Sequence, residues 1–258
     1  MPLDAVFRIA SMTKPVTSLA LMTLAEEARV MLRHPVGRYI PEFGDAKVGM
    51  ERAPAEREMT VLDLLRHTSG LTYGALPVPG VGPHPVKRAY VDAKVGDFDQ
   101  TIEEFTARLA RQPLLHQPGT HWEYGHSTDV VGRVVEVVSG MDLDRFVRER
   151  IAAPLGMRDT GFWAPPEAKE RAAFPQVDPA TGRKQPIPDP LQKPRWFSGG
   201  GGMVSTALDY ARFCQMLLNG GELDGARILR PETVRQMTTN LTGDMATLRG
   251  PGRHSKAP

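Results

Sequence analysis

The chain has 258 residues and a mass of 28.4 kDa, which is enough for one large domain or two smaller ones. Its 32 basic and 30 acidic residues leave a net charge of +2 without a basic cluster, so we expect no nucleic-acid partner. No apolar run is long enough to span a bilayer, and the N-terminus lacks the pattern of a secretory signal. As written, the sequence therefore predicts a cytoplasmic protein without membrane contact, although a missing N-terminus would change the predicted location.

The first predicted elements are a short strand and a buried helix. Residues 5–11 (AVFRIAS) have the β-branched and aromatic content of a strand. Pro15 locates the start of the following helix, because proline is tolerated only in an opening turn. Ser11 therefore lies at the N-terminus of this helix, and Lys14 follows one turn later on the same face. Residues 16–25 are apolar on most sides, which is typical of a buried helix.

Further helices are predicted along the rest of the chain. Thr101 and Glu104 form a capping-box pattern at the start of one of them. Prolines and glycines mark 76–85 and 164–195 as loops, and we expect the tail 249–258 to be disordered. Strand-like alternation is scarce, so we expect a mostly helical chain with two to four short strands. The predicted helices cover 59–73, 101–115, 127–140, 142–156, 208–221 and a segment after Pro231.

The histidines and the single cysteine give no metal or redox pattern. His116, His121 and His126 are five residues apart, which is not a ligand spacing, so we expect no metal and no cofactor. His67, in HTSG, is interpreted as a structural turn residue. Cys214 is the single cysteine, so the chain cannot form an internal disulfide. It lies in an apolar helical pattern, and we expect it to be a small core residue.

Ser11 and Lys14 form an S-x-x-K pair with two possible meanings. Ser11 is either a catalytic nucleophile activated by Lys14 or a helix N-cap beside a surface charge. A nucleophilic hydroxyl must lose a proton during attack, and a buried lysine can accept it with a tyrosine as relay. Tyr124 follows a Pro-Gly turn and precedes a predicted helix, which is a suitable position for that relay.

Several segments of the sequence together resemble one known family. They are RIASMTKPVTS, LLRHTSGLTY, PGTHWEYGHSTDVVGRVVEVVSG, PLGMRDTGF and GGGGMVSTALDYARFCQMLLNGGELDGARIL. In this order they resemble the serine β-lactamase and penicillin-binding superfamily, specifically its class C β-lactamase and family VIII carboxylesterase branch. The similarity runs from about residue 5 to about residue 242. It implies an α+β parent fold in which a helical region packs with an antiparallel sheet.

The resemblance also implies roles for individual residues. Ser11 would be the nucleophile, and its backbone N–H would be one oxyanion donor. Lys14 and Tyr124 would be the paired base and proton relay, which we treat as one coupled unit because the sequence does not say which removes the proton.

Two departures from the family pattern affect the predicted activity. His126 stands where β-lactamases usually have the asparagine of Y-x-N, which favours ester substrates over β-lactams. We expect His126 either to contact substrate or to be a helix-start residue without that contact. The chain also contains no K-T-G, H-x-G or W-G-G segment, which in the family closes the site on a sheet strand.

These observations predict a single partial domain over residues 1–258. Its expected parts are a nucleophile helix over 11–28, a mainly helical region over 29–195, a return segment to the sheet over 196–242 and a disordered tail over 243–258. The chain is expected to be mostly α because most sheet strands are missing. The helices over 16–28 and 208–218 would then expose apolar faces and promote self-association.

The predicted function is that of a serine hydrolase acting through an acyl-enzyme on a small-molecule substrate. Carboxylester hydrolysis is the first expectation, with a class C-like β-lactamase or a non-catalytic fragment or binding module as alternatives. Because the third catalytic segment is absent, the sequence leaves open whether the chain is an active enzyme.

Overall fold

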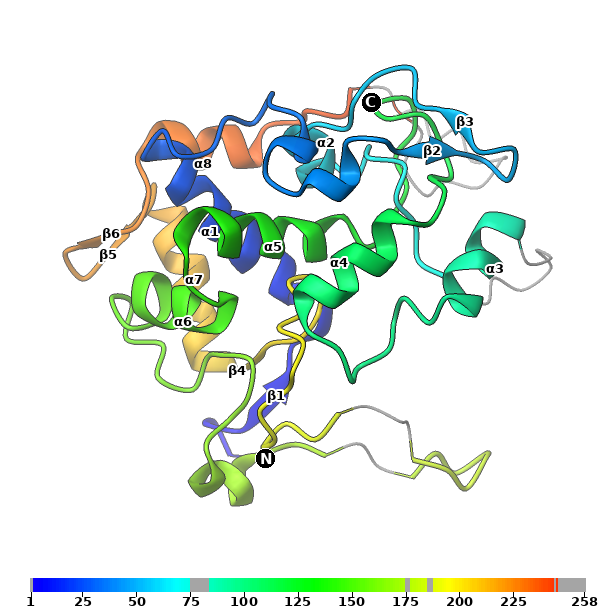
Figure 1. Ribbon diagram of the computed structural model, residues 1–258. Coiled ribbons are helices and arrows are strands. Elements are labelled where there is room, and N and C mark those ends of the chain that lie inside the picture. The colour runs from blue at the N-terminus through cyan, green and yellow to red at the C-terminus, as the bar shows by residue number, and fades with distance from the viewer. Residues whose placement is uncertain (1, 75–83, 175–176, 185–187, 244, 246–258) are drawn as a thin grey trace, which may run out of the picture.

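A computed structural model describes residues 2–74, 84–174, 177–184, 188–243 and 245. Helices dominate this part of the chain, and short strands occupy its edges (Figure 1). The helices are α1 (Thr13–Glu26), α2 (Val61–Leu65), α3 (Pro85–Asp92), α4 (Ile102–Ala110), α5 (Ser127–Ser139), α6 (Leu143–Val147), α7 (Ala207–Leu218) and α8 (Pro231–Thr238). The strands are β1 (Val6–Arg8), β2 (Lys47–Val48), β3 (Ala53–Pro54), β4 (Val204–Thr206), β5 (Glu222–Leu223) and β6 (Ala226–Arg227).

The core is built around α1, which packs along α5 (Figure 1). Val16, Leu19 and Leu24 of α1 have no exposed surface, and neither do Val130 and Val134 of α5. The side of α1 that was expected to be exposed is covered by α5 and α6, so that expectation is wrong. The helical region of this chain supplies enough apolar partners to bury its own central helix.

Helix α7 is covered on one side only. Its inner face carries Phe213 and Met216, which are buried, whereas Leu208 and Leu218 at its two ends are exposed. Cys214 is also exposed, which contradicts its predicted place in the core. It follows Phe213 directly, and a step of one residue turns a side chain about 100° around a helix.

The strands form three separate two-stranded antiparallel sheets within the described residues. β1 pairs with β4, with Val6 opposite Thr206 and Arg8 opposite Val204. β2 pairs with β3, and β5 pairs with β6. The described residues therefore contain six strands, more than the two to four expected, because two-residue hairpins are too short to show alternation in sequence. The β1–β4 pair joins the N-terminal end of α1 to the segment that precedes α7 (Figure 1).

Some helix ends lie where the sequence predicted them, and one does not. The Thr101–Glu104 capping box is present at α4, and α5 ends at Gly140 with a left-handed φ of 73°. α2 is much shorter than the predicted helix over 59–73, because His67 adopts a φ of 57° and ends the helical path.

Other boundaries also differ from those expected. Helix α3 was not predicted. Residues 142–156 form α6 and a π-helical turn, Arg148–Ala152. The described parts of 164–195 contain a 3₁₀ turn, Pro166–Arg171, and otherwise few regular elements. The expected loop over 76–85 and the expected disordered tail lie mostly outside the described residues.

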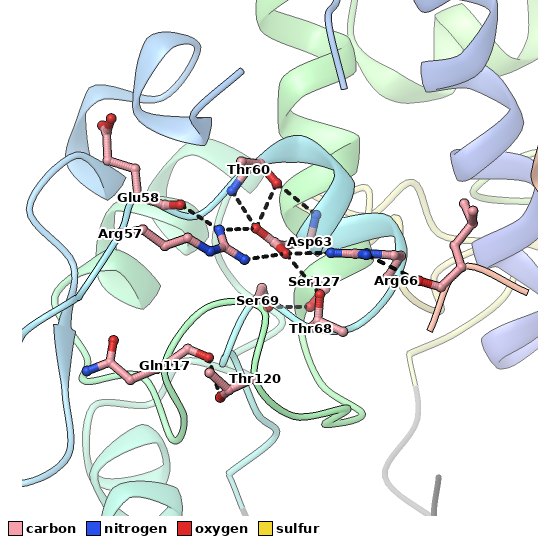
Figure 2. A network of polar contacts seen from close by, with 11 residues as sticks. Arg57, Glu58, Thr60, Asp63, Arg66, Thr68, Ser69, Gln117, Thr120 and Ser127 are labelled. Carbon is pink, nitrogen blue, oxygen red and sulfur yellow. Dashed lines mark hydrogen bonds and ion pairs between the residues drawn. The ribbon is translucent and has the colours of Figure 1, made fainter. Parts of the chain in front are cut away.

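A buried ion-pair network holds α2 and the turn after it, as Figure 2 shows. Asp63 has no exposed surface and accepts hydrogen bonds from Arg57, Arg66 and Thr68. Its carboxylate also accepts from both the backbone N–H and the hydroxyl of Thr60. Burial acts to raise the pKa of Asp63, but the hydrogen bonds from Arg57 and Thr60 outweigh it and hold the pKa far below its usual value.

A second contact ties this turn to α5. Ser69 Oγ and Ser127 Oγ lie 2.8 Å apart, so the segment after the turn is fixed against the first residue of α5 (Figure 2). No helix in the described part of the chain is both long and apolar enough to cross a membrane.

Candidate active site

Ser11 lies in a tight turn between β1 and α1. Ala10, directly before it, has a φ of 46°, a left-handed conformation that is strained for a residue with a Cβ. Ser11 is exposed and lies in a 3₁₀ turn, Ala10–Met12, whose N-cap is Ile9. The N-cap of α1 is Met12, and neither cap uses a side-chain hydrogen bond. The structure therefore contradicts the interpretation of Ser11 as a helix N-cap.

Lys14 is buried, with 8% of its surface exposed, so it is not a surface charge. Its Nζ donates to Ser11 Oγ at 3.1 Å, to the Tyr73 hydroxyl at 3.2 Å and to the Gly200 carbonyl at 2.6 Å. An ammonium has three N–H donors, and these three acceptors use all of them. Lys14 Nζ is therefore held by three oxygen atoms within hydrogen-bond distance.

Tyr124 contacts the same serine. Its hydroxyl donates to Ser11 Oγ at 2.6 Å, and the Lys14 Nζ lies 4.6 Å from the centre of its ring. A cation at this distance from an aromatic face is attracted to it. The structure thus brings together all three residues predicted as catalytic, Ser11, Lys14 and Tyr124, from segments 113 residues apart.

Tyr73 belongs to the same site and was not predicted. Its ring packs edge-on against Tyr124 at 5.4 Å and against His126 at 4.6 Å between centroids. Burial raises the pKa of Tyr73 above its usual value, and the charges of Asp129 and Tyr124 raise it further. Tyr73 therefore remains a neutral phenol that accepts a hydrogen bond from Lys14.

His67 covers the far side of Tyr124. The two ring centroids are 5.1 Å apart, and His67 Nδ1 is buried without a hydrogen-bond partner among the described residues. Burial and the nearby Lys14 charge lower the pKa of His67 to about 4. His67 is thus a neutral ring that packs against Tyr124, which agrees with its interpretation as a structural residue.

His126 is the N-cap residue of α5 and is 7% exposed. Its Nδ1 donates to Asp129 Oδ2 at 3.1 Å, because an ionised carboxylate can only accept. Burial acts to raise the pKa of Asp129, but hydrogen bonds from His126, Ser198 and the Gly200 N–H outweigh it and lower the pKa. This bond fixes which nitrogen of His126 carries the proton.

A cavity of about 510 Å³ opens on the side of the site where Tyr73 and His126 lie. Tyr73 and His126 form its wall nearest to Lys14, and most of the remaining wall is apolar. Its size is in the range of small-molecule sites. The other residues of the wall include Tyr90, Val91, Val95 and Gly96.

The site residues that the sequence did not predict are Tyr73, Asp129 and Gly200. Tyr73 ends the LLRHTSGLTY segment, and Gly200 lies in the GGGG segment, so both were visible as parts of matched segments without a role. Asp129 also lies in a matched segment, PGTHWEYGHSTDVVGRVVEVVSG, and it too had no predicted role. No group of three or more His, Cys, Asp or Glu side chains suited to a metal ion occurs among the described residues.

Known proteins similar to this chain include esterases. Protein Rv1367c of Mycobacterium tuberculosis is 41% identical over 93% of this chain and 61% of its own length. Esterase EstB of Burkholderia gladioli is 34% identical over 96% of this chain and 65% of its own length. The solved structure of EstCE1, described as a hydrolase with promiscuous acyltransferase activity, matches with a TM-score of 0.73 and 28% identity over 91% of this chain and 63% of that chain.

The chain thus spans less than two thirds of the length of these curated relatives. The family profile named Beta-lactamase matches residues 1–254, nearly the whole sequence. This match agrees with the resemblance seen in the sequence segments and with the helical and antiparallel elements of the fold. The chain belongs to the beta-lactamase family.

Proposed function

We propose that this chain is a serine hydrolase that cleaves carboxylic esters through an acyl-Ser11 intermediate. The observation that carries the proposal is the contact of one exposed serine with both a tyrosine and a buried lysine, at 2.6 and 3.1 Å. These distances lie within the reach required of a nucleophile and its activating base. The similarity to an esterase and to a hydrolase supports the same class of reaction.

In the first step Ser11 Oγ attacks the ester carbonyl carbon and transfers its proton to the Lys14–Tyr124 pair. The Tyr124 hydroxyl donates to Ser11 in the structure, so the pair must first lose one proton before it can accept the proton of Ser11. We assign the transferred proton to the Tyr124 oxygen, because it lies closest to Ser11 and because the three N–H groups of Lys14 are engaged. Lys14 Nζ lies 4.6 Å from the centre of the Tyr124 ring, so both members of the pair are in place beside Ser11.

The second half of the reaction returns that proton. Tyr124 donates it to the alkoxide oxygen as the bond between the carbonyl carbon and the alcohol breaks, which leaves acyl-Ser11. A water molecule then attacks the acyl carbon and gives its proton to the same pair. The pair passes that proton to Ser11 Oγ as the bond between Oγ and the acyl carbon breaks, which releases the carboxylic acid and restores Ser11. An alcohol in place of water would produce a new ester, and the acyltransferase activity named for EstCE1 favours that as a second candidate activity.

The preference for esters over β-lactams rests on His126. Its ring is held by Asp129 and packs on Tyr73, in the position where β-lactamases of this family usually have asparagine. We propose that His126 lines the substrate cavity without the amide group that would pair with a lactam side chain. The assembled site argues against the alternative of a non-catalytic binding module.

The test compares p-nitrophenyl butyrate with nitrocefin, using the chain and its Ser11→Ala variant as the matched control. We expect ester hydrolysis that depends on Ser11 and slower or absent nitrocefin hydrolysis. Faster turnover of nitrocefin would contradict the esterase assignment, and equal ester hydrolysis by Ser11→Ala would contradict the nucleophile.

A further inference from the structure

Asp129 is a buried carboxylate that contacts none of the three catalytic side chains. It is 2% exposed and lies in the first turn of α5. Its Oδ1 accepts from the Ser198 hydroxyl at 2.6 Å and from the Gly200 N–H at 3.0 Å, and its Oδ2 accepts from His126. A buried carboxylate is tolerated only when several donors satisfy it, as they do here.

Gly200 connects this carboxylate to the catalytic lysine. Its N–H donates to Asp129, and its carbonyl accepts the shortest of the three hydrogen bonds from Lys14, at 2.6 Å. A Cβ at Gly200 would lie 2.6 Å from Asp129 Oδ2, so the close approach of the backbone to the carboxylate requires glycine. The two groups belong to adjacent peptide planes that meet at the Cα of Gly200, so fixing the N–H restricts where the carbonyl can lie.

The neighbouring residue Gly199 holds the same turn to α1 and α5. Its carbonyl accepts from Thr17 Oγ1 at 2.9 Å, and a Cβ there would lie 2.7 Å from the Thr128 carbonyl. Thr17 of α1 therefore holds the turn at Gly199, and Asp129 of α5 holds it at Gly200. Without the bond to Asp129, nothing else among the described hydrogen bonds holds the Gly200 N–H.

We propose that Asp129 is a positioning residue for acylation: it holds the Gly200 N–H and so restricts the backbone at Gly200, whose carbonyl holds Lys14 Nζ against Ser11. The proposal rests on the proposed function. A lysine side chain has four rotatable carbons and no preferred direction of its own, so its ammonium needs a fixed acceptor to stay in place. The other acceptors, Ser11 Oγ and the Tyr73 hydroxyl, are side chains at longer distances, whereas the Gly200 carbonyl is part of the clamped backbone.

The test is a double-mutant cycle between Asp129 and Lys14, read from the rate at which a fluorophosphonate probe labels Ser11. Asp129→Ala and Asp129→Asn are each made in the wild-type chain and in Lys14→Ala, and rates are normalised to the folded fraction. We expect Asp129→Ala to slow labelling by about tenfold or more, since a misplacement of about 1 Å can cost about a hundredfold. In the Lys14→Ala background, adding Asp129→Ala should slow the labelling of Ser11 very little further. Asp129→Asn keeps an acceptor oxygen for Gly200 and should label at a rate close to wild type.

Asp63→Asn is the matched control, because Asp63 is equally buried and hydrogen-bonded but contacts no residue of the site (Figure 2). It should lower stability and leave the labelling rate of folded molecules unchanged. Equal slowing by Asp129→Ala with and without Lys14, or no slowing at all, overturns the proposal. If Asp129→Ala does not fold, clear slowing by folded Asp129→Asn in the wild-type background overturns the proposal, because this variant keeps the acceptor oxygen for Gly200. Equal labelling of wild type and Lys14→Ala is a different result, because it rejects the proposed function itself.

Discussion

The hydroxyl of Tyr124 lies 2.6 Å from Ser11 Oγ, closer than any other side-chain group that contacts this serine in the described structure. Lys14 Nζ is 3.1 Å away and divides its three hydrogens among three acceptors. The two basic groups therefore differ in their surroundings. This difference supports the proposed roles, in which Tyr124 exchanges a proton with Ser11 and Lys14 acts beside it.

This division of roles predicts the effects of two substitutions. Tyr124→Phe removes the oxygen that receives the Ser11 proton, and Lys14→Ala removes the cation that supports it. Each should slow fluorophosphonate labelling of Ser11 by at least about a hundredfold, the usual scale of general acid–base loss. Intact-mass measurement of labelled protein against time would give both rates.

A third substitution provides the comparison for this prediction. Tyr73→Phe removes only a neutral hydroxyl that accepts from Lys14, so its effect should be smaller than that of Tyr124→Phe. A Tyr124→Phe variant that labels as fast as wild type would show that the proton leaves Ser11 by another route.

The cavity beside the site predicts a dependence on acyl-chain length. Gly96 lines its wall, and a Cβ built there meets no described atom within 4 Å. Gly96→Leu should therefore fold normally and reduce the space available to substrate. If the acyl chain occupies this cavity, kcat/KM for p-nitrophenyl octanoate relative to acetate should fall by about tenfold, because each buried CH₂ contributes about 0.8 kcal/mol.

Acetate is the internal control for Gly96→Leu, since its acyl group is too short to need the cavity. Thermal unfolding of the variant would show whether the fold is unchanged. An unaltered ratio of octanoate to acetate hydrolysis in a folded variant would place the acyl chain elsewhere.

His67 predicts a loss of stability in mild acid. Its pKa in the folded chain is lowered to about 4, below the value of about 6.5 for an unfolded histidine. The unfolded chain therefore binds the proton first as pH falls, so the contribution of neutral His67 is full above about pH 6.5 and is lost progressively towards pH 4. The expected loss over this window is about 3 kcal/mol of unfolding free energy.

Urea unfolding at pH 7 and pH 4.5 would measure this loss, with His67→Asn as the comparison. Asparagine tolerates the left-handed backbone at this position but does not titrate. The variant should be less stable at pH 7 and show a smaller change with pH. An identical pH dependence in both proteins would assign the acid sensitivity to other groups.

The sequence predicted the parts of the site that lie in recognisable motifs. Ser11, Lys14 and Tyr124 each lie in such a segment, and short-range patterns also predicted the cap of α4 and the glycine end of α5. The spacing of residues along one helix and the pattern of capping residues involve neighbours in the sequence, so both can be recognised in a single sequence.

The remaining site residues depend on contacts across the fold. Gly200 meets Lys14 from 186 residues away, and Asp129 meets Gly200 from 71 residues away. Contacts between residues so far apart in the sequence produce no periodic pattern from which they could be predicted. Cys214 shows the same limit on a smaller scale, because an apolar segment does not by itself indicate which of two adjacent residues faces the core.

Asp63 predicts the largest stability effect outside the site. Its carboxylate is fully buried between Arg57 and Arg66, and its pKa is held well below the usual value despite its burial. A carboxyl group with a lowered folded pKa contributes stability above its unfolded pKa of about 4, and this contribution is lost as pH falls further. Asp63→Asn should lower the unfolding free energy at pH 7 by about 3 kcal/mol, near the lower end for a broken buried ion pair, because both arginines retain some contact with water.

The difference in stability between wild type and Asp63→Asn should become smaller below about pH 4, where the unfolded wild-type carboxyl group becomes protonated. Asp45→Asn is the control, because Asp45 pairs with Lys47 at 2.6 Å but is 87% exposed, and a surface pair contributes at most about 1 kcal/mol. Urea unfolding of the three proteins at pH 7 and pH 3 would separate these effects. A loss in Asp63→Asn no larger than in Asp45→Asn would mean that the network in Figure 2 does not hold α2 in place.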